Sequence, residues 1–404
     1  MIDMDFVDEF YADKDLSHLK KLTVVIPTYN RNYYLSRCLW YHSHFPFGEI
    51  IVADSSPEEK KVVNRETVRK LVEERGANIR HLEYPPETEK YGGDITRKWG
   101  DAVQHVETEY SQVCTDKEFL IPTTLCKCIA FLDEHSDYDM ATGPRYDIKL
   151  SKSGDLKFFE AHPGRSLSID YPDPLARLLV FSVSKPDTFN ALSLRRSHIH
   201  KYTYNELLES GINDLRFGEL GFELLSVLSS KAIFFPNEPH VGRDVVKSSS
   251  PRVKRSTPES SASRYPLLNE YAQNGLYADY MDRLASCLTR EYLSSGPSTM
   301  TVLEVNDLMK ITITNLQTIR GFFENPQSEV FRWGMFVLSY LPAGMSAYVR
   351  RVLNRPAQPP VADIPDELQI VTQILIETLH LHNKDEPLPF DSSTVGYLYP
   401  KEGK

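Results

Sequence analysis

The fold is decided by the stretch Leu22-Thr-Val-Val-Ile-Pro-Thr-Tyr-Asn-Arg31, in which a short β-branched run stops at a proline and a polar turn follows at once. A second apolar run, Ile50-Ile-Val-Ala, ends in the same way at Asp54. Continuous apolar runs of this length are typical of strands that are buried on both faces of a parallel sheet. Because the carboxyl ends of parallel strands share one edge of the sheet, we expect the two polar turns to lie close together there.

Segments with apolar residues at helical spacing separate the strands. One spans residues 33–45, between the first two strands, and a capping serine, Ser56, with early acids opens the next. Further strands are expected at 78–84, 112–114 and 232–236, and residues 138–150 read as one strand. This alternation predicts the α/β class, with a mostly parallel, Rossmann-like sheet flanked by helices.

The composition predicts more than one domain. The chain has 404 residues, 41% of them hydrophobic. This length exceeds that of one average domain, and the hydrophobic content is enough for a substantial core. Residues 246–265 are rich in serine and basic residues, as in a flexible linker, and the residues after 266 have helical character. We therefore predict a lead-in at 1–20, an α/β domain at 21–245, a linker at 246–265 and an α-helical domain at 266–404.

Charge and targeting features restrict the partners. The net charge of −10 argues against nucleic acid as a ligand, because binding to phosphates needs a concentrated positive surface. The five scattered cysteines predict reduced thiols, and the amino terminus lacks the features of a secretory signal, so a cytoplasmic location is the prediction. The uncharged stretch 333–349 is short for a membrane span. A buried helix pair, a peripheral membrane contact and a homodimer surface stay open for it.

Three motifs together resemble the GT-A fold glycosyltransferases, family 2 in particular. They are Val25-Ile-Pro-Thr-Tyr-Asn-Arg31, the aspartate at 54 that closes the second strand, and Asp116-Lys-Glu118 in the place of Asp-x-Asp. The resemblance covers residues 1–245. It implies an inverting, metal-assisted transfer of a sugar from a UDP- or GDP-sugar to an acceptor hydroxyl on a glycan, a lipid-linked molecule or a protein.

The resemblance places the nucleotide sugar on the first turn, at Pro27, Thr28, Tyr29 and Arg31. Asp54 is expected to accept a hydrogen bond from the base or the ribose. The alternative is an ordinary turn whose aspartate caps the next helix. Upstream of the acidic motif, Arg97 or Lys98 could bind the sugar nucleotide, since a basic residue often occupies this helix in similar enzymes.

The motif at 116–118 is expected to hold Mn²⁺ or Mg²⁺, which would neutralise the leaving diphosphate. Asp116 and Glu118 alternate along the chain, so their carboxylates can point the same way and share an ion, with Asp116 nearer the nucleotide. By resemblance, His240 would be a third ligand and Arg243 would clamp a phosphate. Lys117 replaces an acid that the family usually has, so it could weaken the metal site or contact phosphate itself. The alternative is a solvated turn.

An inverting transfer also needs a carboxylate that takes the proton of the acceptor. The segment Phe217-Gly-Glu-Leu-Gly-Phe-Glu-Leu224 resembles the Gly-Glu-Asp region that carries this base, with Leu220 in place of the aspartate. Glu219 is therefore the predicted base, and Asp214 and Glu223 are alternatives. Two glutamates one turn apart are also common on the solvated face of a helix.

Two other functions fit part of the sequence. A sugar nucleotidyltransferase would use a similar sheet but needs a glycine-rich phosphate loop after the first strand, and the turn at 27–31 has no glycine. A degenerate transferase that only binds a sugar or a partner is favoured by Lys117 and Leu220. The basic segment 247–255 could close over the diphosphate as a lid.

Overall fold

The computed structural model describes residues 5–89, 93–150, 156–161, 167–184, 192–212, 215–245, 276–296, 300–324 and 364–378. The chain divides into two compact units. Residues 1–265 and 362–404 form the first unit, and residues 266–361 form the second.

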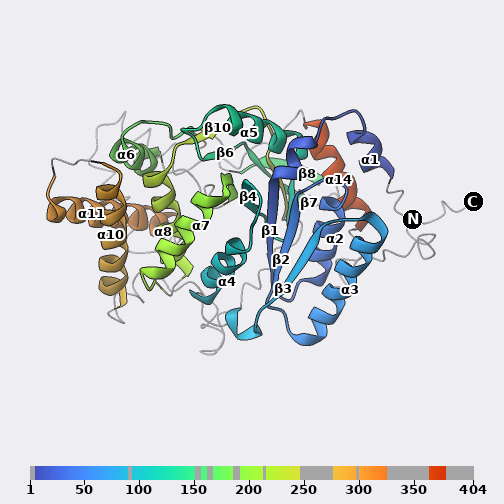
Figure 1. Cartoon of the computed structure of the whole chain (residues 1–404), viewed down its shortest axis with the longest axis horizontal. Coiled ribbons are helices and arrows are strands. Elements are labelled where there is room, and N and C mark those ends of the chain that lie inside the picture. The colour runs from blue at the N-terminus through green and yellow to red at the C-terminus, as the bar shows by residue number, and fades with distance from the viewer. Residues whose placement is uncertain are drawn as a thin grey trace, which may run out of the picture. The chain divides into compact units, whose positions relative to one another are not determined.

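The first unit is built on a seven-stranded sheet (Figure 1). In spatial order its strands are β10 (Ala232–Phe234), β6 (Met140–Thr142), β9 (Leu194–Arg196), β4 (Tyr110–Val113), β1 (Leu22–Thr28), β2 (Glu49–Asp54) and β3 (Ile79–Glu83). Among these strands β9 runs antiparallel to its two neighbours, and the other pairs are parallel. The predicted α/β class with a mostly parallel sheet is confirmed.

A second sheet has four strands, in the order β5 (Glu118–Leu120), β11 (Val241–Asp244), β7 (Arg145–Leu150) and β8 (Leu156–Glu160). The prediction of a single strand at 138–150 is wrong, because the chain leaves β6 in one sheet and enters β7 in the other. Gly143 lies at this break. A Cβ atom there would approach the carbonyl oxygen of Glu238 to 2.1 Å, so the crossing has room only for glycine.

Helices connect and cover the strands of the first unit. They are α1 (Asp5–Tyr11), α2 (Asn32–His42), α3 (Glu58–Arg75), α4 (Gly93–Gln104), α5 (Pro122–Glu134), α6 (Pro174–Ser184), α7 (Ser197–Glu209) and α8 (Leu215–Ser229), with short 3-10 turns η1 (Ser17–Lys21) and η2 (Pro86–Glu89). Every residue of α2 is buried, because this helix packs against both α3 and β5. It therefore forms part of the core directly behind the end of β1.

The helix α14 (Asp366–Thr378) belongs to the first unit, although it lies in the part of the chain predicted as a separate helical domain. Its Leu368 and Val371 lie against Gly242 of β11, and the hydroxyl of Tyr33 on α2 donates to the carbonyl of Thr378 at 2.8 Å. Figure 1 shows α14, in red, among the blue amino-terminal elements. The predicted domain boundaries stay a prediction.

The second unit contains α10 (Leu276–Ser294) and α11 (Val302–Glu324), which pack against each other. Both helices lie in the part of the chain for which helical character was predicted. In the ranges that the structure describes, no helix has the length and apolar character needed to cross a membrane.

The carboxyl end of β1 is open on one side. β4 pairs only with residues 22–25 of β1, so the missing backbone N–H of Pro27 falls beyond the end of β4. The chain can therefore carry a proline within a central strand. The polar turn that follows extends past its neighbour on this side.

Candidate functional site

The candidate site lies at the carboxyl edge of the main sheet, where β1 and β4 end. The hydroxyl of Thr28 donates to Asp116 Oδ2 at 2.9 Å, and Arg31 Nη1 lies 3.2 Å from Asp116 Oδ1. The carboxylate of Asp116 is 2% exposed, whereas the side chain of Arg31 is 32% exposed. The structure thus brings the first and third sequence motifs together around one buried carboxylate.

The first turn also contacts the end of β2. The backbone N–H of Asn30 donates to the hydroxyl of Ser56 at 2.8 Å, and Asn30 has a φ of 53°, which asparagine tolerates better than most residues. Pro27 is buried within β1, and Tyr29, the first residue after this strand, is 39% exposed. The Tyr29 ring is therefore accessible to solvent, and its predicted contact with the nucleotide stays a prediction.

The ammonium group of Lys117 lies close enough to the carboxylate of Asp116 for their charges to interact. Its Nζ lies 5.1 Å from the centroid of the Tyr34 ring, and it has no hydrogen bond or ion pair to any residue in the described ranges. Burial and the positive charge of Arg31 lower the pKa of Lys117, and the carboxylates of Asp116 and Asp244 offset only part of this. The carbonyl of Lys117 accepts a hydrogen bond from the N–H of Asp244 at 2.9 Å, which ties the turn to β11.

Arg243 reaches the site from β11, where it pairs in register with Glu118 of β5. Its guanidinium donates two hydrogen bonds to Asp147, at 2.9 Å and 3.0 Å, and its side chain stays 31% exposed. The charge of Arg243 acts on Lys117 as well. Three cationic side chains therefore lie around the turn at 116–118, namely those of Arg31, Lys117 and Arg243.

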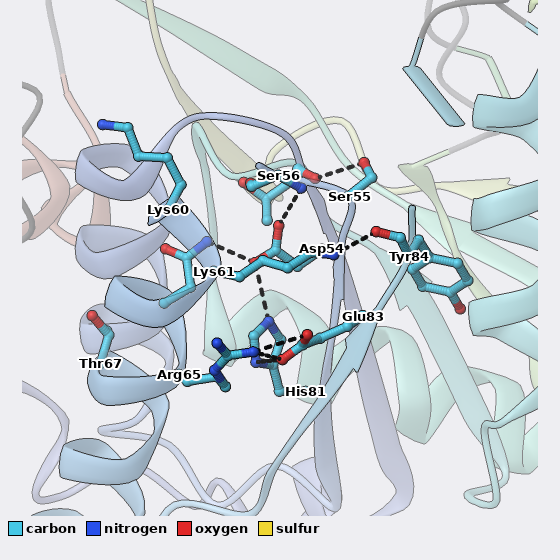
Figure 2. Close-up of polar contacts among 12 residues, drawn as sticks. Asp54, Ser55, Ser56, Lys60, Lys61, Arg65, Thr67, His81, Glu83 and Tyr84 are labelled. Carbon is cyan, nitrogen blue, oxygen red and sulfur yellow. Dashed lines mark hydrogen bonds and ion pairs between the residues drawn. The ribbon is translucent and has the colours of Figure 1, made fainter. Parts of the chain in front are cut away.

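Asp54 does not face this site. Its side chain is fully buried, and Figure 2 shows its carboxylate between Ser56 and His81. Oδ1 accepts from the Ser56 N–H at 2.8 Å, and Oδ2 accepts from Asn64 at 2.8 Å and lies 3.1 Å from His81 Nε2. Burial raises the pKa of Asp54, but the bonds from His81, Asn64 and Ser56 outweigh it and lower the pKa to about 2. This geometry favours the alternative interpretation, in which Asp54 stabilises a turn. It does not favour a contact between Asp54 and the base or the ribose.

A pocket of about 400 Å³ opens between the residues after β3 and the first half of α4. It is lined by Tyr84, Pro85, Glu87, Thr88, Arg97, Lys98 and Asp101. The buried ammonium of Lys98 donates to the carbonyl of Thr28 at 3.3 Å and to the hydroxyl of Ser55 at 2.8 Å, so the pocket adjoins the ends of β1 and β2. This volume is typical of a small-molecule site.

The polar side chains that line the pocket differ in whether they already have a partner in the protein. The hydroxyl of Tyr84 donates to Asp101 Oδ2 at 2.7 Å, and burial together with this carboxylate raises the pKa of Tyr84. Arg97 is exposed and has no ion pair within the described part of the chain. Of the two basic residues that the sequence left open, Arg97 is free to meet a ligand, and Lys98 holds the strand ends.

Glu219, the predicted base, is half-buried on α8. The neighbouring Gly218 packs on α4, where a Cβ atom would come within 2.8 Å of the Thr96 hydroxyl oxygen. Since Thr96 directly precedes Arg97, this part of α8 lies beside the helix that lines the pocket. Glu223 is 1% exposed and its charge acts on the buried Arg195, so it is not accessible to an acceptor.

His240 is not placed to complete a metal site. It is fully buried, its Nε2 accepts from the Gln112 amide at 2.9 Å, and its Nδ1 lies 4.0 Å from Cys128 Sγ. Burial lowers the pKa of His240 to about 3. These neighbours describe a neutral histidine that packs inside the core, which is the role that a lone histidine most often has.

The carboxylates of the turn at 116–118 are also engaged. Glu118 Oε2 accepts from the backbone N–H of Thr115 at 2.9 Å, and Asp116 carries Arg31 as its cationic partner. The described residues contain no group of three or more His, Cys, Asp and Glu side chains that could hold a metal ion. The donor set therefore does not fit the predicted Mn²⁺ or Mg²⁺ site with three protein ligands.

Several features of the site were not predicted. Tyr84 and Asp101 could have been found, because Tyr84 follows β3 as directly as the first turn follows β1. The buried ion pair between Arg37 and Asp244, which lies behind the turn at 116–118, joins residues 207 positions apart and has no local signal. Three predictions concern residues outside the described ranges: Asp214, the basic segment 247–255 and the stretch 333–349.

No protein-family model matches the chain, and no curated protein matches it. Among solved structures it is similar to S. aureus TarS 1–349 in complex with UDP-GlcNAc, at 13% identity over 91% of this chain and 88% of that chain, with a TM-score of 0.47. The same fragment in complex with UDP gives 13% identity, the same coverage and a TM-score of 0.43. The mannosyltransferase PcManGT from Pyrobaculum calidifontis, in complex with GDP-Man and Mn²⁺, gives 12% identity over 90% of this chain and 86% of that chain, with a TM-score of 0.36.

Proposed function

We propose that the chain is a glycosyltransferase that moves a sugar from a UDP- or GDP-sugar to an acceptor hydroxyl. The observation that carries this proposal is the cationic turn at 116–118, at the carboxyl edge of a parallel sheet and close to a pocket of about 400 Å³. Ligands of open α/β sheets bind at this edge. The resemblance of the first motif to the GT-A glycosyltransferases supports the same class of donor.

The nucleoside of the donor is assigned to the pocket. Tyr29 and Tyr84 offer aromatic surface for the base, and Arg97 offers donors for the ribose or the nearer phosphate. Asp101 takes the acceptor role that the sequence gave to Asp54, since it is a carboxylate that lines the pocket. The diphosphate then extends from the pocket toward the turn at 116–118.

Glu219 acts as the general base in this proposal. Its carboxylate takes the proton of the acceptor hydroxyl while that oxygen forms a bond to the anomeric carbon of the sugar. The bond from the anomeric carbon to the diphosphate oxygen breaks, and the nucleoside diphosphate leaves with the electron pair. Attack opposite the leaving group inverts the configuration. The chain holds both reactants in line, which supplies part of the rate enhancement.

Release of nucleoside diphosphate from a panel of UDP- and GDP-sugars, with a mixture of candidate acceptors, tests the function. One donor is expected to be turned over, and Glu219→Gln is expected to lower kcat about 10²- to 10⁴-fold with little change in KM. Glu209→Gln, at the exposed end of α7, is the matched control and is expected to keep the wild-type rate.

The other outcomes separate the rival functions. Chemistry that depends on pyrophosphate would indicate a nucleotidyltransferase, and donor binding without turnover would indicate a degenerate binding module. A kcat for Glu219→Gln within about threefold of wild type would remove Glu219 as the base.

A further inference from the structure

The half-buried ammonium of Lys117 makes no direct ion pair with a carboxylate of the described residues, although the charges of Asp116 and Asp244 act on it. It lies over the ring of Tyr34, which offers only a cation–π contact. Partial burial removes part of the favourable solvation of an ammonium group. An anion bound next to the ammonium compensates for this loss. The same turn has its backbone fixed through the bond between the Asp244 N–H and the Lys117 carbonyl. Lys117 is thus a half-buried positive charge on a turn whose backbone is held in place.

The neighbouring carboxylates are less available to a metal ion. Asp116 is bonded to Thr28 and Arg31, so a divalent cation at this carboxylate would lie against a guanidinium group that already neutralises it. Glu118 is bonded within its own turn. The side chains of Lys117 and Arg31 can therefore supply the positive charge that a bound diphosphate needs.

We propose that Lys117, together with Arg31, neutralises the diphosphate of the donor, so that nucleotide binding and transfer proceed without a divalent cation. The identity of the ligand rests on the proposed function. Lysine serves as a point charge for phosphate, and Arg31 has N–H groups left to donate while Nη1 stays on Asp116. The same two charges stabilise the leaving diphosphate as the glycosidic bond breaks.

The rival arrangement is a divalent ion held by Asp116 and the phosphates of the donor. Such ions are often bound by one or two carboxylates plus substrate oxygens. The two arrangements predict opposite effects of Asp116→Asn. If Lys117 and Arg31 hold the diphosphate, loss of a nearby negative charge leaves binding unchanged or tightens it. If an ion bridges Asp116 and the diphosphate, the same substitution abolishes binding.

Calorimetric titration of the full chain with UDP and GDP, in EDTA and separately in Mn²⁺, tests the proposal. We expect one nucleotide to bind in EDTA with an affinity within about threefold of that in Mn²⁺. Lys117→Met is expected to weaken this binding about tenfold or more, while Lys117→Arg keeps most of it. Lys20→Met removes the same charge from an exposed position just before β1, at the opposite edge of the sheet, and should bind as wild type.

Uridine or guanosine separates the diphosphate from the base, because Lys117→Met should not change the binding of the nucleoside. Circular dichroism confirms that each variant is folded. Binding that needs Mn²⁺ and is lost in Asp116→Asn would overturn the inference and leave the proposed glycosyltransferase standing. Binding in EDTA that Lys117→Met does not weaken would also overturn it. If neither nucleotide binds in either buffer, the proposed function fails as well.

Discussion

Asp54 holds the turn after β2 through three hydrogen bonds, so its substitution is expected to change stability. Asp54→Asn replaces one acceptor oxygen by a donor, which would face the donors of Asn64 and His81. The pKa of Asp54 is lowered from 3.8 to about 2 in the folded chain. At 1.36 kcal/mol for each pKa unit, the ionised carboxylate stabilises the fold by about 2 kcal/mol at pH 7.

The pH dependence follows from the direction of this shift. Because the folded-state pKa is depressed, the stabilisation is complete above the unfolded-state value of 3.8 and is lost as the pH falls through about 2. Urea unfolding of wild type and Asp54→Asn should therefore differ by about 2 kcal/mol at pH 7 and by clearly less at pH 3. Asp13→Asn, with a 79% exposed side chain, is the control. A difference that stays the same at both pH values would contradict the role of the charge.

Arg97 and Lys98 are adjacent on α4 but differ in burial, so together they separate binding from stability. Arg97→Ala removes an exposed side chain and is expected to weaken UDP or GDP binding about tenfold without moving the thermal midpoint. Lys98→Met removes a buried donor from the carbonyl of Thr28, which keeps its bonds from Ser55, and from the hydroxyl of Ser55, so it should lower the midpoint. Calorimetry and thermal unfolding measure the two effects. Unchanged affinity in Arg97→Ala would remove Arg97 from the nucleotide site.

The same residues show what sequence reasoning could reach. It grouped Thr28, Arg31 and Asp116, because the ends of parallel strands share an edge whatever the rest of the fold does. It could not orient Asp54, because the partners that turn this carboxylate inward are Asn64 and His81, which lie 10 and 27 residues further along the chain. An aspartate at the tip of a strand fits a ligand site and a turn equally well until those partners are known.

At the scale of elements, α14 is expected to contribute directly to the stability of the first unit. Ile374 is fully buried and Ile376, on the same helix, is 57% exposed. Ile374→Ala should lower the free energy of unfolding by about 2–5 kcal/mol, because it removes buried methyl groups and leaves a cavity. Ile376→Ala should lower it by well under about 1 kcal/mol. Chemical denaturation measures both. Equal effects would show that α14 does not pack on the unit in solution.

Among the elements that the sequence analysis did not predict, three strands are short, whereas α7 has 13 residues. β5, β9 and β11 have three or four residues each, too few for a pattern of two-residue alternation to stand out. β9 is also hidden by its composition, since it reads Leu-Arg-Arg and buries Arg195. The Arg195 guanidinium donates at 2.6 Å to the hydroxyl of Ser226 on α8. This partner is 31 residues away, so no local sequence pattern predicts it. The long apolar strands β1 and β2 were predicted because burial on both faces leaves a continuous apolar run.

At the scale of the whole molecule, composition alone could not assign α14. The change to helical character after residue 266 predicted one carboxyl-terminal domain, but the structure divides the chain so that residues 362–404 group with 1–265. An amphipathic helix must bury its apolar face, and its sequence does not say against which partner. Contacts between residues far apart in the sequence decide that α14 packs on the first unit. One of them is the hydrogen bond from the Tyr33 hydroxyl to the Thr378 carbonyl.

The cysteines allow the two units to be followed separately. All five are free and buried, four of them in the first unit and Cys287 in the second. A buried thiol reacts only when the structure around it opens, and compact units with their own cores open independently. We therefore expect no rapid reaction with N-ethylmaleimide in native protein and complete labelling in denaturant. Across a urea series read by mass spectrometry, Cys287 should follow its own transition, whereas Cys38 and Cys128 should share another. Labelling of Cys287 and Cys128 at the same urea concentration would mean that both units unfold together, and single stability values would then describe the entire chain.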